Sequence, residues 1–470
     1  MRESLPIHLP LVLACVALLA GCAAGPDFTR PAVPEPAARF AHADAPLADP
    51  SLLWHGLGDD QLSVMMRRAL AGNHDLRAAL ARLNAAQALR RQGELDAWPV
   101  VTAQARAAQQ HASVSEAAGG PRSQRQFSAG IQAGWELDLF GRLRRSTEAQ
   151  QADVQASAAD LQALRVAVVA QVAAAYTDLR SGQQQLQLAR QQADNQYATL
   201  RLARVRLGAG SANALEAARA SAQWQAVQAR LPALQARVAV AQHRLAVLLG
   251  LPPQALLAEL DALRPLPALP PAVDPGIPAD LLRRRPDVAA AEARLHAATA
   301  RVGVATADLF PRLSLGGLLA SVAPGAGALW EAGSASRSVW LGVDWSFLDV
   351  GRVRARIAAS EAGAAAALAQ YQQTVLQALE DTENALVQLQ RRREEDALLQ
   401  QAAVERAAAE RLAWRRYEAG SAALGEVLDT QRDLLAAQDA AADSRRRALQ
   451  AAVALYQALA GGWAGQVASS

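Results

Sequence analysis

The stretch Trp135-Glu-Leu-Asp-Leu-Phe-Gly-Arg-Leu-Arg144 decides the fold, because a divergent copy of it recurs later in the chain. It returns in register, at an offset of 210, as Trp345-Ser-Phe-Leu-Asp-Val-Gly-Arg-Val-Arg354. Further pairs recur in the same order at an offset of 212, namely Asp75, Asp96 and Pro99 with Asp287, Asp308 and Pro311, and Gly208 and Gly250 with Gly420 and Gly462. An ordered series of this length indicates two tandem copies of one structural unit.

Each copy contains a segment in which apolar side chains alternate strictly with polar or small ones. Residues 126–137 and 338–347 show this pattern. Alternation over about ten residues is typical of a strand in a membrane β-barrel, although a half-buried strand of a soluble sandwich alternates in the same way. A weaker strand pattern precedes each segment, near residues 99–109 and 311–321. We therefore expect β-hairpins at about 98–138 and 310–348, with exposed loops at 111–125 and 323–337.

Around the hairpins the pattern becomes helical. Residues 142–207 and 352–417 lack proline, and Ala, Gln, Leu and Arg predominate. Each stretch predicts a helix on the order of 100 Å long. A glycine turn at Gly208 or Gly420 should follow, and then one returning helix to about Gly250 or Gly462. Shorter helices are predicted at 73–97 and 287–308. Such long helices pack as antiparallel coiled coils.

The composition favours long helices, and the sequence lacks the features of a nucleic-acid-binding protein or an enzyme. The chain has 470 residues, of which 51% are hydrophobic but only 4% aromatic, so small side chains supply much of the apolar content. Such residues, alanine above all, favour closely packed helices. A net charge of +3, without basic blocks among aromatic residues, predicts no nucleic-acid binding. The sequence shows no nucleophile–base pair, metal-ligand spacing or phosphate loop, so we expect neither an enzyme nor a cofactor.

The N-terminus predicts a lipid anchor. Residues 9–20 form an apolar run that is too short to span a bilayer, and it ends in Leu19-Ala20-Gly21-Cys22. Small residues before a cysteine are typical of a bacterial lipoprotein cleavage site. We predict a signal peptide at 1–21, a covalent lipid such as palmitate on Cys22, and a tether at 22–60; an ordinary signal peptide with an incidental cysteine is the alternative. No later run of about 18 apolar residues is uninterrupted, so a membrane crossing would use strands.

The remaining boundaries follow from the duplication. We expect a first repeat at 61–250, a Pro-rich linker at 251–279, a second repeat at 280–463 and a tail at 464–470. Four strands in one chain cannot close a barrel, and an open edge in lipid leaves backbone groups unsatisfied at several kcal/mol each. If the strands cross a membrane, the chain must therefore oligomerise.

The chain resembles the TolC-type outer-membrane factors, in particular the lipoprotein branch that includes OprM and the NodT group. The resemblance rests on five stretches, residues 135–144, 276–287, 309–315, 428–432 and 455–463. It implies an α+β membrane protein in which a homotrimer forms one 12-stranded β-barrel, continuous with a long periplasmic α-helical coiled-coil barrel.

The same resemblance implies the exit duct of a tripartite efflux system. Such a duct sits in the outer membrane, contacts its lipid and receives small molecules or drugs. Its partners would be a periplasmic adaptor (membrane fusion protein) and an inner-membrane transporter, of the RND type. A duct for type I protein secretion or metal efflux is an alternative. A structural envelope lipoprotein without a channel is a further one.

By resemblance, Asp429 matches an acidic ring that narrows the periplasmic end of the tunnel. Arg432, one helical turn later, would be its ion-pair partner; an exposed Asp–Arg pair without a gating role is the alternative. Gly425 stands where the family often has a bulky apolar residue, so Leu424 is the candidate apolar constriction. The resemblance also implies tips that contact the adaptor, at Arg206, Leu207, Gly208, Tyr417, Gly420 and Ser421.

Overall fold

The computed structural model describes residues 23–32, 39–41, 57–113, 115, 121–270 and 275–460. The predicted signal peptide, Cys22 and the predicted tail lie outside these residues. The chain divides into two compact units. Unit 1 comprises the described residues within Met1–Ala32, Ala81–Ala158 and Ala290–Gln373, and unit 2 those within Val33–Leu80, Ala159–Ala289 and Thr374–Ser470. Both sequence copies contribute to each unit.

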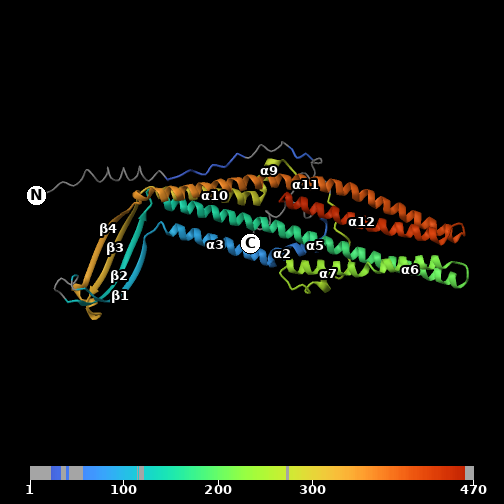
Figure 1. Ribbon diagram of the computed structural model, residues 1–470, viewed down its shortest axis with the longest axis horizontal. Coiled ribbons are helices and arrows are strands. Elements are labelled where there is room, and N and C mark those ends of the chain that lie inside the picture. Colours follow the sequence, from blue (N-terminus) through green and yellow to red (C-terminus); the bar gives the residue numbers. More distant parts are fainter. Residues whose placement is uncertain are drawn as a thin grey trace. The chain divides into compact units, whose positions relative to one another are not determined.

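The two copies share one order of elements: a helix, a β-hairpin, a very long helix and a return (Figure 1). The first copy contains α2 (Asp60–Gly72), α3 (His74–Leu95), β1 (Val100–His111), β2 (Ser123–Leu137), α5 (Arg142–Gly208), α6 (Ala214–Gln228) and α7 (Leu231–Leu248). The short helices α8 (Leu257–Leu260) and α9 (Pro278–Arg284) follow. The second copy contains α10 (Pro286–Ala307), β3 (Arg312–Ala323), β4 (Ala335–Asp344), α11 (Val350–Glu418) and α12 (Leu424–Ala458).

In unit 1 the four strands form one antiparallel sheet in the order β1-β2-β3-β4. The register pairs Ile131 with Leu319 and Leu315 with Leu341, so the apolar side chains of the alternating pattern share one face. Within the described chain, β1 and β4 each lack a second neighbouring strand. The sheet therefore has two open edges.

The predicted hairpins are present, but β4 ends earlier than the alternation does. The alternating pattern runs to Phe347, whereas the strand stops at Asp344, which pairs with Arg312 at the start of β3. Beyond Arg312 there is no partner strand, and a short 3₁₀ turn (η5, Phe347–Asp349) leads into α11. The prediction of a strand to Phe347 was therefore wrong.

The long helices α5 and α11 have 67 and 69 residues, as the absence of proline predicted. By length and composition, α5 contains an 18-residue window apolar enough to cross a membrane. However, 39% of that window is buried inside the protein. A partly buried core helix meets the same criteria, so this window by itself is weak evidence for a membrane span.

The returning helix differs between the copies. In the second copy α12 is continuous over 35 residues, whereas in the first copy α6 ends at Gln228 and α7 starts at Leu231. Pro232 lies in the first turn of α7 and has no N–H for a helix that would continue from α6. The prediction of a single helix to Gly250 was therefore wrong.

The core of unit 2 contains a fully buried arginine. Arg180 is 0% exposed and donates to the carbonyl of Ala262 at 2.8 Å, and its guanidinium lies 4.9 Å from the ring centroid of Tyr176. The Tyr176 hydroxyl donates to Asp59 at 2.9 Å. Burial raises the pKa of Tyr176 to about 12, so the phenol stays neutral. These bonds tie α5 to the start of α2.

Candidate functional site: a membrane face, an anchor corner and two helix tips

One face of the sheet exposes large apolar side chains. On β4, Val339 is 82% exposed, and Leu341 and Val343 are each 63% exposed. Ile131 and Leu319 extend the same face across β2 and β3. An exposed apolar surface over several strands marks contact with lipid or another apolar surface. The alternation of this face with small and polar residues is the pattern of a membrane strand.

Two tryptophans fix the ends of the hairpins. The indole N–H of Trp135 donates to the carbonyl of Ala97 at 2.9 Å, and that of Trp345 donates to the carbonyl of Leu309 at 3.0 Å. Both rings are partly exposed next to the apolar face. Tryptophan is favoured where an apolar region meets water, because its ring is apolar and its N–H is polar.

The repeated motif builds the corner at which β2 turns into α5. Asp138 caps the helix by accepting from the backbone N–H groups of Leu143 and Arg144 at 3.1 and 2.9 Å. Arg142 forms a two-bond ion pair with Glu136, at 2.8 and 2.7 Å. The acidic residues of the first copy and Arg142 are therefore explained by this local geometry.

The segment that follows Cys22 packs against this corner. The backbone N–H of Ala24 donates to the carbonyl of Phe140 at 3.0 Å. Arg145, with only 6% of its side chain exposed, donates to the carbonyl of Ala24 at 3.2 Å and to Asp27 at 2.5 Å. Gly25 lies so close to the Gly303 backbone of α10 that a Cβ atom would not fit there. The corner thus fixes residues 23–27, although Cys22 itself is outside the described residues.

The two helix turns of unit 2 have the same backbone geometry. Gly210 and Gly420 both have φ of +71°. In each turn the serine after the glycine donates its backbone N–H to a carbonyl in the last turn of the long helix. Ser211 donates to Arg206 and Ser421 to Arg416, each at 2.9 Å. The structurally equivalent glycines are therefore Gly210 and Gly420, and the predicted pairing of Gly208 with Gly420 was wrong. The sequence offset between the two copies is therefore 210 at the tips, the same as for the motif that starts at Trp135 and Trp345.

The residues predicted to contact the adaptor differ in their exposure and in their contacts within the tips. Arg206 donates to the hydroxyl of Tyr417, and its guanidinium lies 5.3 Å from that ring's centroid. The hydroxyl of Ser421 donates to the carbonyl of Arg416 at 3.0 Å. Leu207 is 38% exposed, and no atom would lie within 4 Å of a Cβ added to Gly208. Leu207, Gly208 and Gly420 therefore offer open surface. Arg206 and Tyr417 join the two tips, and Ser421 closes its own turn.

The predicted gate pair lies on the surface of α12. The side chains of Asp429 and Arg432 are 63% and 68% exposed, and their nearest charged atoms are 3.4 Å apart. Arg432 also lies 3.8 Å from Asp433, which forms a 2.6 Å ion pair with Arg406 of α11. Exposed pairs of this kind are worth roughly 0–1 kcal/mol, so the pair can separate easily.

Leu424 is buried, in contrast to Asp429. It is 1% exposed and belongs to an apolar cluster, the tip cluster. The members of the tip cluster are Leu200, Ala203, Ala220, Ala413, Leu424, Val427 and Leu428. A side chain enclosed in this cluster cannot narrow a tunnel, so its burial does not favour Leu424 as the apolar constriction. Its position instead fixes the first turn of α12 against α5, α6 and α11.

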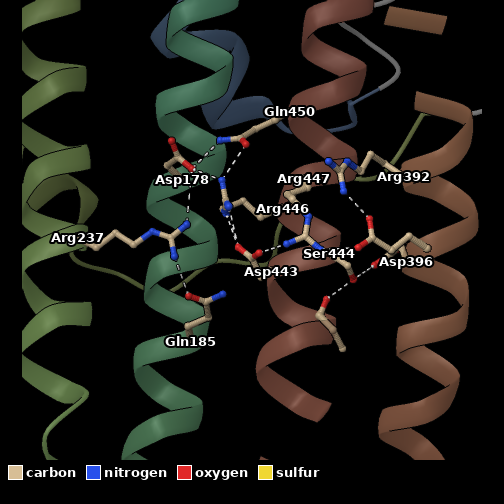
Figure 2. Close-up of polar contacts among 12 residues, drawn as sticks. Asp178, Gln185, Arg237, Arg392, Asp396, Asp443, Ser444, Arg446, Arg447 and Gln450 are labelled. Atoms are coloured by element: carbon tan, nitrogen blue, oxygen red, sulfur yellow. Dashed lines mark hydrogen bonds and ion pairs between the residues drawn. The ribbon is translucent and has the colours of Figure 1, made fainter. Parts of the chain in front are cut away.

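Away from the tips, a polar network joins α5, α11 and α12 with α7 (Figure 2). Arg446 of α12 lies between Asp443, at 2.7 Å, and Asp178 of α5, at 3.5 Å. Arg447 continues the network to Glu395 of α11 at 2.8 Å. Figure 2 shows Arg237 of α7 directed at Asp178 from the opposite side, with the nearest charged atoms 3.8 Å apart.

Asp396 is the most buried carboxylate of this network, at 4% exposure. It accepts from the hydroxyl of Ser444 at 2.9 Å and from Arg445 at 3.0 Å. For Asp443, burial alone would raise the pKa, but hydrogen bonds and charge from Arg446, with the charge of Arg447, lower it. Sequence patterns did not reveal this network, because its partners come from distant parts of the chain.

Among the described residues, no group of three or more His, Cys, Asp or Glu side chains is placed to hold a metal ion.

Comparison with known proteins identifies the family. The sequence model described as outer membrane efflux protein matches residues 65–251 and 277–461. The pyoverdine export outer membrane protein OpmQ of Pseudomonas putida is 34% identical over 474 residues, covering 98% of each chain.

Solved structures of outer-membrane channels support the same family assignment. The outer-membrane channel OprN has a TM-score of 0.87 at 39% identity, over 94% of this chain and 100% of that one. The open MtrE channel of Neisseria gonorrhoeae has a TM-score of 0.81 at 26% identity, over 94% and 98%. The solved channels are trimers with a long helical part and a four-stranded sheet per chain, so the predicted fold class is confirmed.

The family is one of channels rather than enzymes. The apolar strand face and the long helices of this chain fit such a channel. The chain belongs to the outer membrane efflux protein family and is an efflux channel of the outer membrane.

Proposed function

We propose that three copies of this chain form one lipid-anchored duct, the exit channel of a tripartite efflux system. The observation that carries the proposal is the four-stranded sheet with an apolar face and open edges at β1 and β4. In lipid, each edge must pair with another strand, because unsatisfied backbone groups cost several kcal/mol each. Identical neighbours, β4 of one chain beside β1 of the next, satisfy both edges at once.

The lipid anchor is proposed on Cys22. Ala23 directly follows it and lies against Gly141 at the strand–helix corner, where a Cβ on the glycine would lie 2.8 Å from the Ala23 Cα atom. A lipid on the preceding residue would therefore start near the end of the membrane strands. Arg145 supports this position by fixing Asp27 and the carbonyl of Ala24.

The proposed cargo is small molecules, delivered by an inner-membrane transporter of the RND type through a periplasmic adaptor. This rests on the family and on the relative named for pyoverdine export. The tips are the proposed contact surface for the adaptor, with Leu207, Gly208 and Gly420 as its open part.

Asp429 and Arg432 are the proposed periplasmic gate. Three symmetry-related carboxylates would repel one another unless cations lie beside them, and Arg432 supplies such a cation 3.4 Å away. An exposed pair of low strength suits a gate that must open, while the buried Leu424 keeps the helix start in place.

The test is the ion conductance of the purified channel in planar bilayers. Asp429→Ala removes the carboxylate ring, so we expect a higher conductance and a greater leak of large antibiotics in cells. Glu405→Gln, an exposed carboxylate of α11, is the matched control and should leave both unchanged. Equal conductance of Asp429→Ala and the original chain would reject the gate assignment, whereas a chain that forms no SDS-resistant trimer would reject the duct itself.

A further inference from the structure

A cavity of about 590 Å³ lies between α5, α11 and α12 in unit 2. Its volume falls within the range of about 300–1,000 Å³ that is typical of small-molecule sites. Leucines from α5 and α12 form its apolar part, and the rest of the lining is mostly amide side chains. The lining belongs to none of the surfaces assigned above, and it includes two features that select a particular ligand chemistry.

The first feature is a pair of buried amide oxygens without donors. Gln192 and Gln196 of α5 are 6% and 3% exposed. Each uses its N–H₂ group to reach α12, Gln192 donating to Gln438 at 2.7 Å and Gln196 to Gln431 at 3.1 Å. The Oε1 atoms of both α5 residues are buried and accept no hydrogen bond within the described part of the chain. A buried acceptor without a donor costs about 1–3 kcal/mol, so the cavity favours an occupant that brings N–H groups.

The second feature is a carboxylate beside an aromatic ring. Glu410 and Trp414 lie one helical turn apart on α11, and both line the cavity while half-buried. Glu410 forms no ion pair with another described residue. Trp414 is held edge-on against Tyr417, with ring centroids 5.7 Å apart. A carboxylate and an indole face attract the same kind of group, a cation with apolar edges.

We propose that this cavity binds planar organic cations that carry N–H donors, with amidinium and guanidinium compounds as the chemical class. The N–H groups would donate to the Gln192 and Gln196 oxygens, the charge would pair with Glu410, and the planar frame would pack against Trp414 and the leucines. Gln431, which lines the cavity, lies between Asp429 and Arg432 in the sequence, so a bound cation contacts the turn of α12 that carries the proposed gate.

The test is a binding titration of benzamidine against the purified full chain in detergent, followed by ligand-observed NMR. We expect saturable binding. Glu410→Gln and Gln196→Leu should each weaken it at least tenfold, and Glu405→Gln, on the same helix but outside the cavity, should leave it unchanged. Circular dichroism and the SDS-resistant trimer band confirm that each variant is folded. Glu410 is half-buried whereas Gln196 is only 3% exposed, so the Glu410 variant remains informative if Gln196→Leu fails to fold.

A second probe separates N–H donation from charge alone. Benzyltrimethylammonium has the same charge and a similar ring but no N–H group, so it should bind at least tenfold more weakly than benzamidine. Equal binding of the two probes, binding unaffected by Glu410→Gln, or no saturable binding of benzamidine would each overturn the proposal. The titration involves no transport, so its result is independent of the proposed duct function.

Discussion

Gly210 and Gly420 adopt the same left-handed conformation, with φ of +71° at each, but the helices that follow them start differently. At α6 the side chain of Asn213 accepts from the N–H of Glu216 at 2.9 Å. At α12 the corresponding residue is Ala423, whose methyl group cannot accept a hydrogen bond. The helix that carries the proposed gate therefore begins without a side-chain cap.

Installing a cap on α12 should stabilise the closed state. Ala423 has φ of −84° and ψ of 156°, close to the −98° and 161° of Asn213, so asparagine fits the backbone there. We expect Ala423→Asn to stabilise the first turn by about 0.5–2 kcal/mol and to lower the open probability in planar bilayers. The reciprocal change, Asn213→Ala, should weaken α6 by a similar amount and leave the open probability unchanged. An equal effect of both variants on opening would show that the tips do not differ in function.

Loss of the buried carboxylate at Asp396 should destabilise the helical part. Asp396→Asn leaves Arg445 without its charged partner and Ser444 with a weaker acceptor; because Arg445 is 36% exposed and stays solvated, we expect a loss of about 1–3 kcal/mol. Thermal unfolding followed by circular dichroism measures it. Glu394→Gln changes an exposed carboxylate on the same helix, paired only locally with Arg391 across 2.8 Å, and should change stability by less than about 0.5 kcal/mol. Similar melting curves for both variants would contradict the role of the network.

A methyl group at Gly316 should disturb the sheet. Gly316 pairs directly with Trp340, whose indole covers the glycine so closely that a Cβ atom would overlap it. We expect Gly316→Ala to cost about 1–3 kcal/mol and to reduce the yield of heat-resistant trimer on SDS gels. At the next residue, a Cβ on Gly317 would approach nothing nearer than the Ser338 carbonyl at 3.8 Å, so Gly317→Ala is the control. A full yield of trimer from Gly316→Ala would show that Trp340 can move.

The pH dependence of stability should include a contribution from Asp287. Burial alone would raise the pKa of its carboxyl, but hydrogen bonds and charge from Arg285 outweigh burial and lower it. A lowered pKa in the folded state stabilises the protein above the unfolded value of 3.8, and this contribution is lost as the pH falls through the folded pKa. Thermal unfolding between about pH 6 and pH 2 should therefore show a steeper acid loss for the original chain than for Asp287→Asn. Asp280→Asn, an exposed neighbour, should keep the original slope.

Local patterns were sufficient to predict the four strands and the two long helices, although not the residue at which β4 ends. Alternation over residues 126–137 and the absence of proline from 142–207 each reflect one repeated physical constraint, so both were visible in the sequence. The break between α6 and α7 was also visible at Pro232, but the apolar pattern continues past it. At the tips, glycine identity alone gave the wrong pairing, because φ at Gly210 depends on the whole turn.

The side-chain environment of the candidate site required the structure. Leu424 and Asp429 lie five positions apart on one helix, yet one is 1% exposed and the other has a 63% exposed side chain. That difference arises from packing of α12 against three other helices, which no local pattern encodes. The cavity glutamines and the Arg446 network depend on pairs more than 200 residues apart, such as Gln192 with Gln438.

The unequal helix starts have a consequence for stoichiometry. Three chains with two tips each make six tips in the proposed trimer, alike in backbone but of two kinds in their side chains, one beginning at Asn213 and the other at Ala423. A hexameric partner would therefore meet two sets of three sites, and its six subunits would bind with two affinities rather than one. Substitutions in one tip would weaken half of the sites, so a duct of this kind can lose partner contacts in two separate steps.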